Sequence, residues 1–180
     1  EDRILEPAPW SPTRDETVER RVQGLAVIQE IATVKPGRAD KYLDAVASRW
    51  RTIAADRGLT VIGAYRTAMR DTEAVILWNV PDLETYTRIL VERAVKAKQL
   101  GFRAAKLEIC TKGPYSHNSL QIEDDREIAK IVQACRKAVG PEMTLMVDVA
   151  YAWRDWKEAL RAIDMFADQD IYFIETPLPS

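Results

Sequence analysis

The second half of the chain alternates short apolar runs with amphipathic segments. The apolar runs cover residues 104–110, 144–148 and 171–175. The segments between them repeat apolar residues at helical spacing, as at Ile128, Ile131, Val132, Cys135 and Val139. Short continuous apolar runs are typical of strands buried on both faces, as in a parallel sheet. The pattern therefore predicts an α-β-α-β-α-β order over residues 91–180, typical of a parallel sheet or a β/α barrel.

The first half follows a different order. A β-rich run spans residues 25–34, and residues 38–57 have the apolar spacing of an amphipathic helix. Two more strands are expected at 59–65 and 74–80, and a helix capped by Asp82 continues to Leu100. This β-α-β-β-α order is most of a ferredoxin-like unit.

The pattern predicts three segments. Residues 1–23 are rich in proline and charge and are expected to be an extended lead-in without a core. Residues 24–90 are expected to form the ferredoxin-like domain, and residues 91–180 a partial barrel. The predicted class is α/β and α+β, a ferredoxin-like α+β unit followed by a partial β/α (TIM-type) barrel segment. Glycines 58, 101 and 140 are placed to end helices.

Composition narrows the class of protein. The 180 residues are 47% hydrophobic and 30% charged with a net charge of −2, which indicates a globular chain without a nucleic-acid-binding patch. No apolar run approaches the roughly 20 residues of a membrane span, and no apolar leader is visible. Cys110 and Cys135 fall in a predicted strand and on an apolar helix face, typical of buried free thiols in a reducing compartment. We therefore expect a cytoplasmic protein that binds neither nucleic acid nor membrane.

The candidate chemistry lies at the ends of the predicted strands. Asp148 and Glu175 each close an apolar run, where a charge is costly unless it has a function or a partner. Ligands and metals bind at the carboxyl ends of parallel strands, so these two acids are placed to share one cation. Lys106 and Glu108 are two residues apart on a strand and point to the same face.

Three motifs in this half resemble the enolase superfamily in its mandelate racemase/muconate lactonizing enzyme-like branch. They are Lys-Gln-Leu-Gly-Phe-Arg-Ala-Ala-Lys-Leu-Glu at 98–108, Val-Gly-Pro leading to Leu-Met-Val-Asp within 139–148, and Phe-Ile-Glu-Thr-Pro-Leu at 173–178. The resemblance implies a TIM-type barrel. It also implies that Asp148 and Glu175 are the first two of three carboxylate ligands for Mg²⁺.

The resemblance further implies a magnesium-dependent lyase or isomerase. Such enzymes act on a small-molecule carboxylate, such as an α-hydroxy or sugar acid, by removing its α-proton. Magnesium takes oxygen ligands and would stabilise the charge that develops in this step. Lys106 would be the candidate catalytic lysine, whose neutral form a nearby cation favours, and Glu108 a second candidate. The sequence departs from the commonest Lys-x-Lys motif at Glu108, and Ala150 replaces a frequent asparagine.

Residues 1–90 resemble the NIPSNAP family and its dimeric α/β-barrel relatives. The matching features are Ile-Leu-Glu-Pro at 4–7, Val-Lys-Pro-Gly at 34–37, Val-Ile-Gly-Ala-Tyr at 61–65 and the strand through Leu77-Trp78. Such domains pair their sheets into dimers. The resemblance therefore implies a homo-oligomer with a ferredoxin-like fold.

Two functional hypotheses remain open. The first is a piece of an enolase-superfamily enzyme, incomplete as a catalyst alone because three parallel strands cannot close a barrel and a third carboxylate ligand is missing. The second is a non-catalytic module whose first half dimerises and binds a small ligand or a partner. The two family resemblances adjoin inside one predicted helix. A truncated gene product, a fusion or a composite sequence would each be compatible with such a junction.

Overall fold

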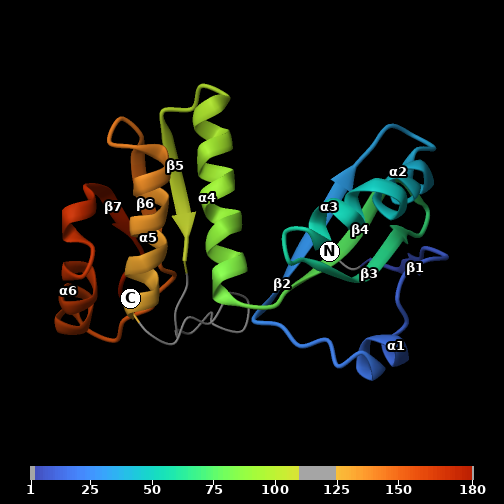
Figure 1. Cartoon of the computed structure of the whole chain (residues 1–180), viewed down its shortest axis with the longest axis horizontal. Helices are drawn as coiled ribbons and strands as arrows, with labels where there is room; N and C mark the ends of the chain where they lie inside the picture. Colours follow the sequence, from blue (N-terminus) through green and yellow to red (C-terminus); the bar gives the residue numbers. More distant parts are fainter. Residues whose placement is uncertain (1–2, 110–124, 180) are drawn as a thin grey trace. The chain divides into compact units, whose positions relative to one another are not determined.

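The computed structural model describes residues 3–109 and 125–179 (Figure 1). The chain divides into two compact units, Glu1–Thr85 and Tyr86–Ser180. It is a mixed α/β protein with one antiparallel and one parallel sheet. None of the helices in the described residues has the length and apolar character needed to cross a bilayer.

The first unit is built on a four-stranded antiparallel sheet with the order β1-β3-β4-β2. The strands are β1 (Leu5–Pro7), β2 (Ala26–Thr33), β3 (Thr60–Thr67) and β4 (Arg70–Val80). β4 pairs with both β2 and β3, so the helical segment that joins β2 to β3 crosses over it. The β-α-β-β order predicted for this region is therefore present, and an antiparallel sheet carries it.

The helical segment of this unit is interrupted by a wider turn. It consists of α2 (Ala39–Ala45), a π-helical turn (Val46–Trp50) and α3 (Arg51–Ala55). A π-turn contains more residues than an α-turn and changes the phase of the apolar stripe. Trp50, one of the apolar residues in the helical pattern of residues 38–57, is 49% exposed. Gly58 adopts a φ of 77° after the helix, as expected for a glycine that ends one.

The core of the first unit lies between the helical segment and one face of the sheet. Its buried members come from the lead-in, the helical segment and strands β3 and β4: Ala8, Leu43, Val46, Val61, Ala64, Ala74, Ile76 and Trp78. Glu30 of β2 accepts hydrogen bonds from the Tyr42 hydroxyl and, at 2.8 Å, from the Trp78 indole N–H. These bonds satisfy the polar groups of Tyr42 and Trp78.

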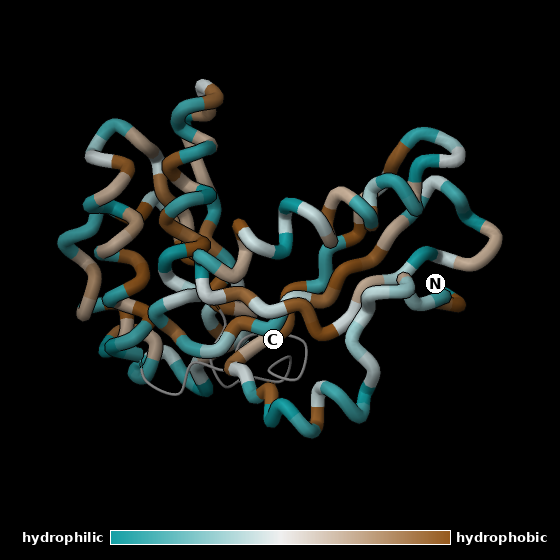
Figure 2. Tube along the Cα trace, turned by 45° about the vertical axis from the view of Figure 1, so that its right-hand side comes forward, coloured by the Kyte–Doolittle hydropathy of each residue, from teal (hydrophilic) through white to brown (hydrophobic). Residues whose placement is uncertain are grey.

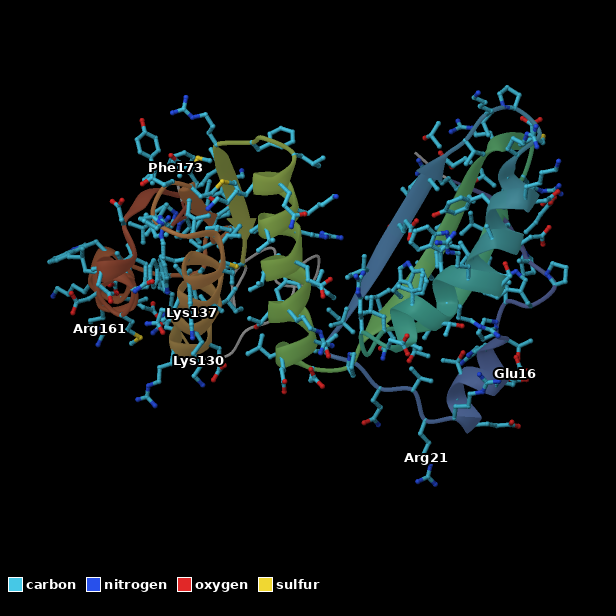
Figure 3. All side chains as sticks on the ribbon, turned by 45° about the horizontal axis from the view of Figure 1, so that its top comes forward. Glu16, Arg21, Lys130, Lys137, Arg161 and Phe173 are labelled. Atoms are coloured by element: carbon cyan, nitrogen blue, oxygen red, sulfur yellow. The ribbon has the colours of Figure 1, made fainter. Side chains whose placement is uncertain are left out.

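The lead-in is more structured than an extended segment. β1 pairs with β3, and a short helix, α1 (Arg14–Glu19), follows it. Thr13 and Glu16 form a reciprocal capping box at the start of α1, and Figure 3 labels Glu16. This pairing of Ser/Thr with Glu three residues later is a sequence signal for a helix start, and the proline content of the segment obscured it.

The second unit contains a three-stranded parallel sheet with the order β5-β6-β7. The strands β5 (Ala104–Glu108), β6 (Thr144–Asp148) and β7 (Ile171–Glu175) alternate with helices α4 (Leu83–Gln99), α5 (Asp125–Val139) and α6 (Trp156–Asp164). A short 3₁₀ turn (Ala167–Gln169) precedes β7. The alternating order predicted from the sequence is confirmed over the described residues. The first turn of α4 belongs to the first unit.

One face of the parallel sheet is buried and the other is open. Leu107, Ile109, Leu145, Val147 and Val149 are at most 3% exposed, and α5 contributes a continuous apolar stripe that includes Cys135. Figure 2 shows apolar residues gathered along these strands and helices. The residues that alternate with the buried ones, such as Lys106 and Glu108, are exposed. The expectation that the strands are buried on both faces is therefore wrong within the described residues. Cys110 lies outside them.

Candidate functional site

The predicted site residues lie on the open face of the parallel sheet. Lys106 and Glu108 come from β5, Asp148 from the end of β6, and Glu175 from the end of β7. Glu108 pairs in register with Asp148, and Asp148 pairs with Glu175. Three acidic residues therefore end three neighbouring parallel strands in one row.

A bulge in β7 places Glu175 in this row, opposite Asp148. Leu145 pairs with Ile171 and Val147 with Ile174, so β7 has one more residue than β6 between the two pairs. Without the extra residue, Ile174 would stand opposite Asp148, and Glu175 would fall on the other face of the sheet. Tyr172 and Phe173, the two residues at the bulge, are 75% and 41% exposed, and Figure 3 labels Phe173.

Lys106 holds the two predicted metal ligands together. Its Nζ lies 2.5 Å from Glu175 Oε2 and 3.3 Å from Asp148 Oδ2. The Asp148 side chain is 19% exposed, while those of Lys106 and Glu175 are each 40% exposed. Both carboxylates therefore direct one oxygen to a common point beside solvent.

The second oxygen of Asp148 is fixed by the protein. Asp148 Oδ1 accepts hydrogen bonds from the Ala150 backbone N–H at 3.1 Å and from the Thr176 hydroxyl at 3.0 Å. Ala150 and Thr176 both have φ of 46°, and such a left-handed conformation is a true outlier for a β-branched residue like threonine. Thr176 is a site residue that the sequence reasoning missed, although it directly follows Glu175 in the Glu-Thr-Pro motif.

Glu108 is not part of this ion-pair cluster. Its backbone carbonyl accepts a hydrogen bond from the Tyr86 hydroxyl at 3.0 Å, and its side chain is exposed. Within the described ranges the Glu108 carboxylate makes no ion pair. The structure thus brings Lys106, Asp148 and Glu175 together and leaves Glu108 beside them in the row.

The electrostatics favour a cation at the common point. The hydrogen bonds to Glu175, and secondarily to Asp148, raise the pKa of the Lys106 ammonium above its usual range. A raised lysine pKa keeps the charge at neutral pH, and the stability from these pairs is lost only as the pH rises through the folded-state value. At neutral pH one ammonium therefore neutralises part of the charge of two carboxylates.

The donor set fits part of a magnesium site. Mg²⁺ prefers oxygen ligands and is often bound by one or two carboxylates together with water and substrate oxygens. Asp148 and Glu175 supply two such oxygens, and the Lys106 ammonium marks a point that both reach. Across residues 3–109 and 125–179, no group of three or more His, Cys, Asp or Glu side chains could hold a metal ion. The two carboxylates are thus a partial ligand set.

Several solved structures resemble the chain over about half of its length. A dipeptide epimerase from Enterococcus faecalis complexed with Mg and the dipeptide L-Leu-L-Tyr is 28% identical, with a TM-score of 0.42. A 3,6-anhydro-D-galactonate cycloisomerase from Zobellia galactanivorans is 31% identical with a TM-score of 0.43. A racemase from Streptomyces coelicolor with bound magnesium is 29% identical with a TM-score of 0.42.

The match spans only part of those proteins. In each of the three cases it covers 52% of this chain and 23% of the other chain. No curated protein matches the chain. A sequence model of the family described as Enolase C-terminal domain-like matches residues 89–180, which include β5, β6 and β7 with their strand-end acids. Through this half of its sequence, the chain belongs to the Enolase C-terminal domain-like family.

Proposed function

We propose that residues 89–180 supply part of the Mg²⁺ site of an enolase-superfamily enzyme of the mandelate racemase/muconate lactonizing enzyme-like group. The observation that supports this most directly is the convergence of Asp148 and Glu175 on one point at the carboxyl ends of parallel strands. The family match over the same residues supports it independently. Asp148 and Glu175 would hold the metal through the oxygens that now contact Lys106.

The proposed reaction is removal of the α-proton from a small-molecule carboxylate, by a cytoplasmic lyase or isomerase. Bound magnesium would supply positive charge beside the substrate carboxylate. Lys106 and Glu108 lie on the same open face as the metal ligands and are the candidate groups to hold or accept a proton. A third carboxylate, expected from the family resemblance, is needed to complete the ligand set.

Calorimetric titration of the chain with Mg²⁺ tests this proposal. The wild-type chain should bind Mg²⁺ with a millimolar or tighter dissociation constant, because two carboxylates together with water can hold the ion weakly. Asp148→Asn combined with Glu175→Gln should abolish this binding, since neutral amides are poorer ligands for a hard cation.

A matched control separates the site from general charge effects. Glu142→Gln combined with Asp164→Asn removes the same charge from two exposed acids away from the strand ends, and it should leave binding unchanged. Equal binding by the wild-type chain and the Asp148/Glu175 variant would overturn the proposal.

A second candidate function is supported by the first unit. Residues opposite each other in an antiparallel pair share a face, so Val27 and Ile31 of β2 lie with Val75 of β4 on the face away from the helix. Val27 is 53% and Ile31 43% exposed. We propose that this face belongs to a ferredoxin-like, NIPSNAP-like unit that pairs with its copy in a homodimer. The chain would then act as a non-catalytic module with a small-ligand or interaction role.

A further inference from the structure

We infer that Lys106 is an internal counter-cation that occupies the metal position and must leave when a divalent cation binds. This inference rests on the proposed function and adds a step to it, because metal uptake becomes an exchange of one cation for another. Its first basis is that the lysine contacts both proposed ligands, Asp148 and Glu175, through a single nitrogen.

The ammonium and the metal would compete for the same oxygens. Asp148 Oδ1 is already engaged by the Ala150 N–H and the Thr176 hydroxyl, so Oδ2 is the oxygen left for a cation. Oδ2 is also the atom that contacts Lys106. On Glu175, Oε2 is the oxygen that Lys106 contacts. A divalent cation that binds Asp148 Oδ2 and Glu175 Oε2 therefore meets the lysine at both oxygens.

The two carboxylates need such a cation when metal is absent. They stand in register on adjacent parallel strands, which are separated by about 4.8 Å. Two carboxylates that contact the same nitrogen are close enough to repel each other, and a positive group between them relieves the repulsion. Lys106 provides that charge from the neighbouring strand β5.

Lys106 is also built to withdraw. Its side chain is 40% exposed, and a lysine ammonium sits on a flexible stem with freely rotating donors. Its departure leaves the two hydrogen bonds that fix Asp148 Oδ1 in place. One oxygen of Asp148 therefore keeps its protein partners during the exchange, while the other, Oδ2, changes its partner.

Magnesium titration of charge variants tests the exchange. Lys106→Met and Lys106→Gln remove the competing charge and should tighten Mg²⁺ binding by about fivefold, since exposed ion pairs are individually weak. Lys106→Arg keeps the charge and should stay within about twofold of the wild type by the same argument. The control Lys130→Met removes the partner of Glu127 on α5, an exposed pair at 2.6 Å, and should change nothing. Figure 3 labels Lys130.

NMR of the wild-type chain during Mg²⁺ titration gives an independent test. The Cε resonance of Lys106, assigned by its loss in Lys106→Arg, should shift as Mg²⁺ saturates the site, because the ammonium leaves both carboxylates. An unmoved resonance, or Mg²⁺ affinity that is equal or weaker in the Met and Gln variants, would overturn the inference and make Lys106 a permanent part of the site. Loss of binding in the Asp148/Glu175 variant would still stand in that case, so the two claims fail separately.

Discussion

At the scale of single residues, Asp148 shows how the site is organised. One of its oxygens accepts bonds from the protein, and the other faces a cation. The position of Asp148 and Glu175 could be predicted from the sequence, because each acid ends an apolar run. The contribution of Thr176 could not be predicted in this way, because it depends on a left-handed backbone at the end of a neighbouring strand.

Removing the Thr176 hydroxyl should weaken the site. Thr176→Val keeps the shape of the side chain but loses the donor to Asp148 Oδ1, so we expect Mg²⁺ affinity to fall by about threefold to tenfold, the effect of one ordinary hydrogen bond. Thr176→Ser keeps the hydroxyl and should retain most of the affinity. Calorimetric titration measures both variants, and equal loss in the two would assign the effect to backbone strain rather than to the hydrogen bond.

Cys135 should be chemically inert in the folded chain. It is fully buried on α5, and burial raises the pKa of its thiol from 9.0 to about 11. In a Cys110→Ser variant, alkylation of Cys135 at mildly alkaline pH should be at least about a hundredfold slower than in urea, because the thiolate forms only on opening. Mass spectrometry follows the reaction, and equal rates with and without urea would contradict the burial.

The same shift predicts a pH dependence of stability. The unfolded thiol ionises near pH 9.0 and the folded thiol near pH 11. Stability should therefore fall as pH rises across that interval. The decrease in the free energy of unfolding should be smaller in Cys135→Ala. Urea unfolding at several pH values measures this difference.

At the scale of elements, one side chain of α5 binds the segments that lead into β6 and β7. The Arg136 guanidinium donates to the carbonyl oxygens of Gln169, Gly140, Met143 and Asp170 at 2.6–3.0 Å. These carbonyls belong to the turn after α5 and to the segment before β7. Arg136 therefore fixes the approach to both β6 and β7.

Loss of the Arg136 guanidinium should destabilise the second unit. Arg136→Met should lower the free energy of unfolding by about 3 kcal/mol, since hydrogen bonds to a charged group contribute more than neutral ones. Arg136→Lys should recover only part of it, because an ammonium cannot reproduce the planar fork. Urea unfolding measures the change. The control Arg161→Met, at an exposed position of α6 labelled in Figure 3, should change stability by roughly 0.5 kcal/mol or less.

Most helices and strands could be predicted from the sequence, but the irregularities within them could not. The spacing of apolar residues indicates β5, β6, β7 and their helices, because burial of one helix stripe imposes that period. The bulge in β7 leaves no mark in the continuous run Ile-Tyr-Phe-Ile. The π-turn in the helix of the first unit is equally invisible, since its residues keep a helical spacing.

At the scale of the whole molecule, two units of different sheet type occur in one chain. The antiparallel unit spans Glu1–Thr85 and the parallel unit Tyr86–Ser180. The change in apolar pattern predicted this change of architecture, while the lead-in was expected to be extended and instead contributes β1 and α1. The family match begins at residue 89, close to the division between the units.

The sheet face that carries the exposed Val27 and Ile31 gives a prediction at this scale. If the face pairs with its copy, sedimentation velocity should find a dimer, and Val27→Glu combined with Ile31→Glu should yield monomers because charges oppose burial. Val18→Glu combined with Met69→Glu is the control, since Val18 and Met69 are 65% and 96% exposed elsewhere in the unit. A wild-type chain that sediments as a monomer at every concentration would contradict the pairing.

The most direct test of the account is to locate a metal ion in crystals of the chain grown with Mn²⁺, a divalent cation that also accepts oxygen ligands. We expect an anomalous peak between Asp148 and Glu175, with Lys106 displaced from both carboxylates. Absence of a peak at this position at saturating Mn²⁺, with Lys106 still bridging the two acids, would contradict it.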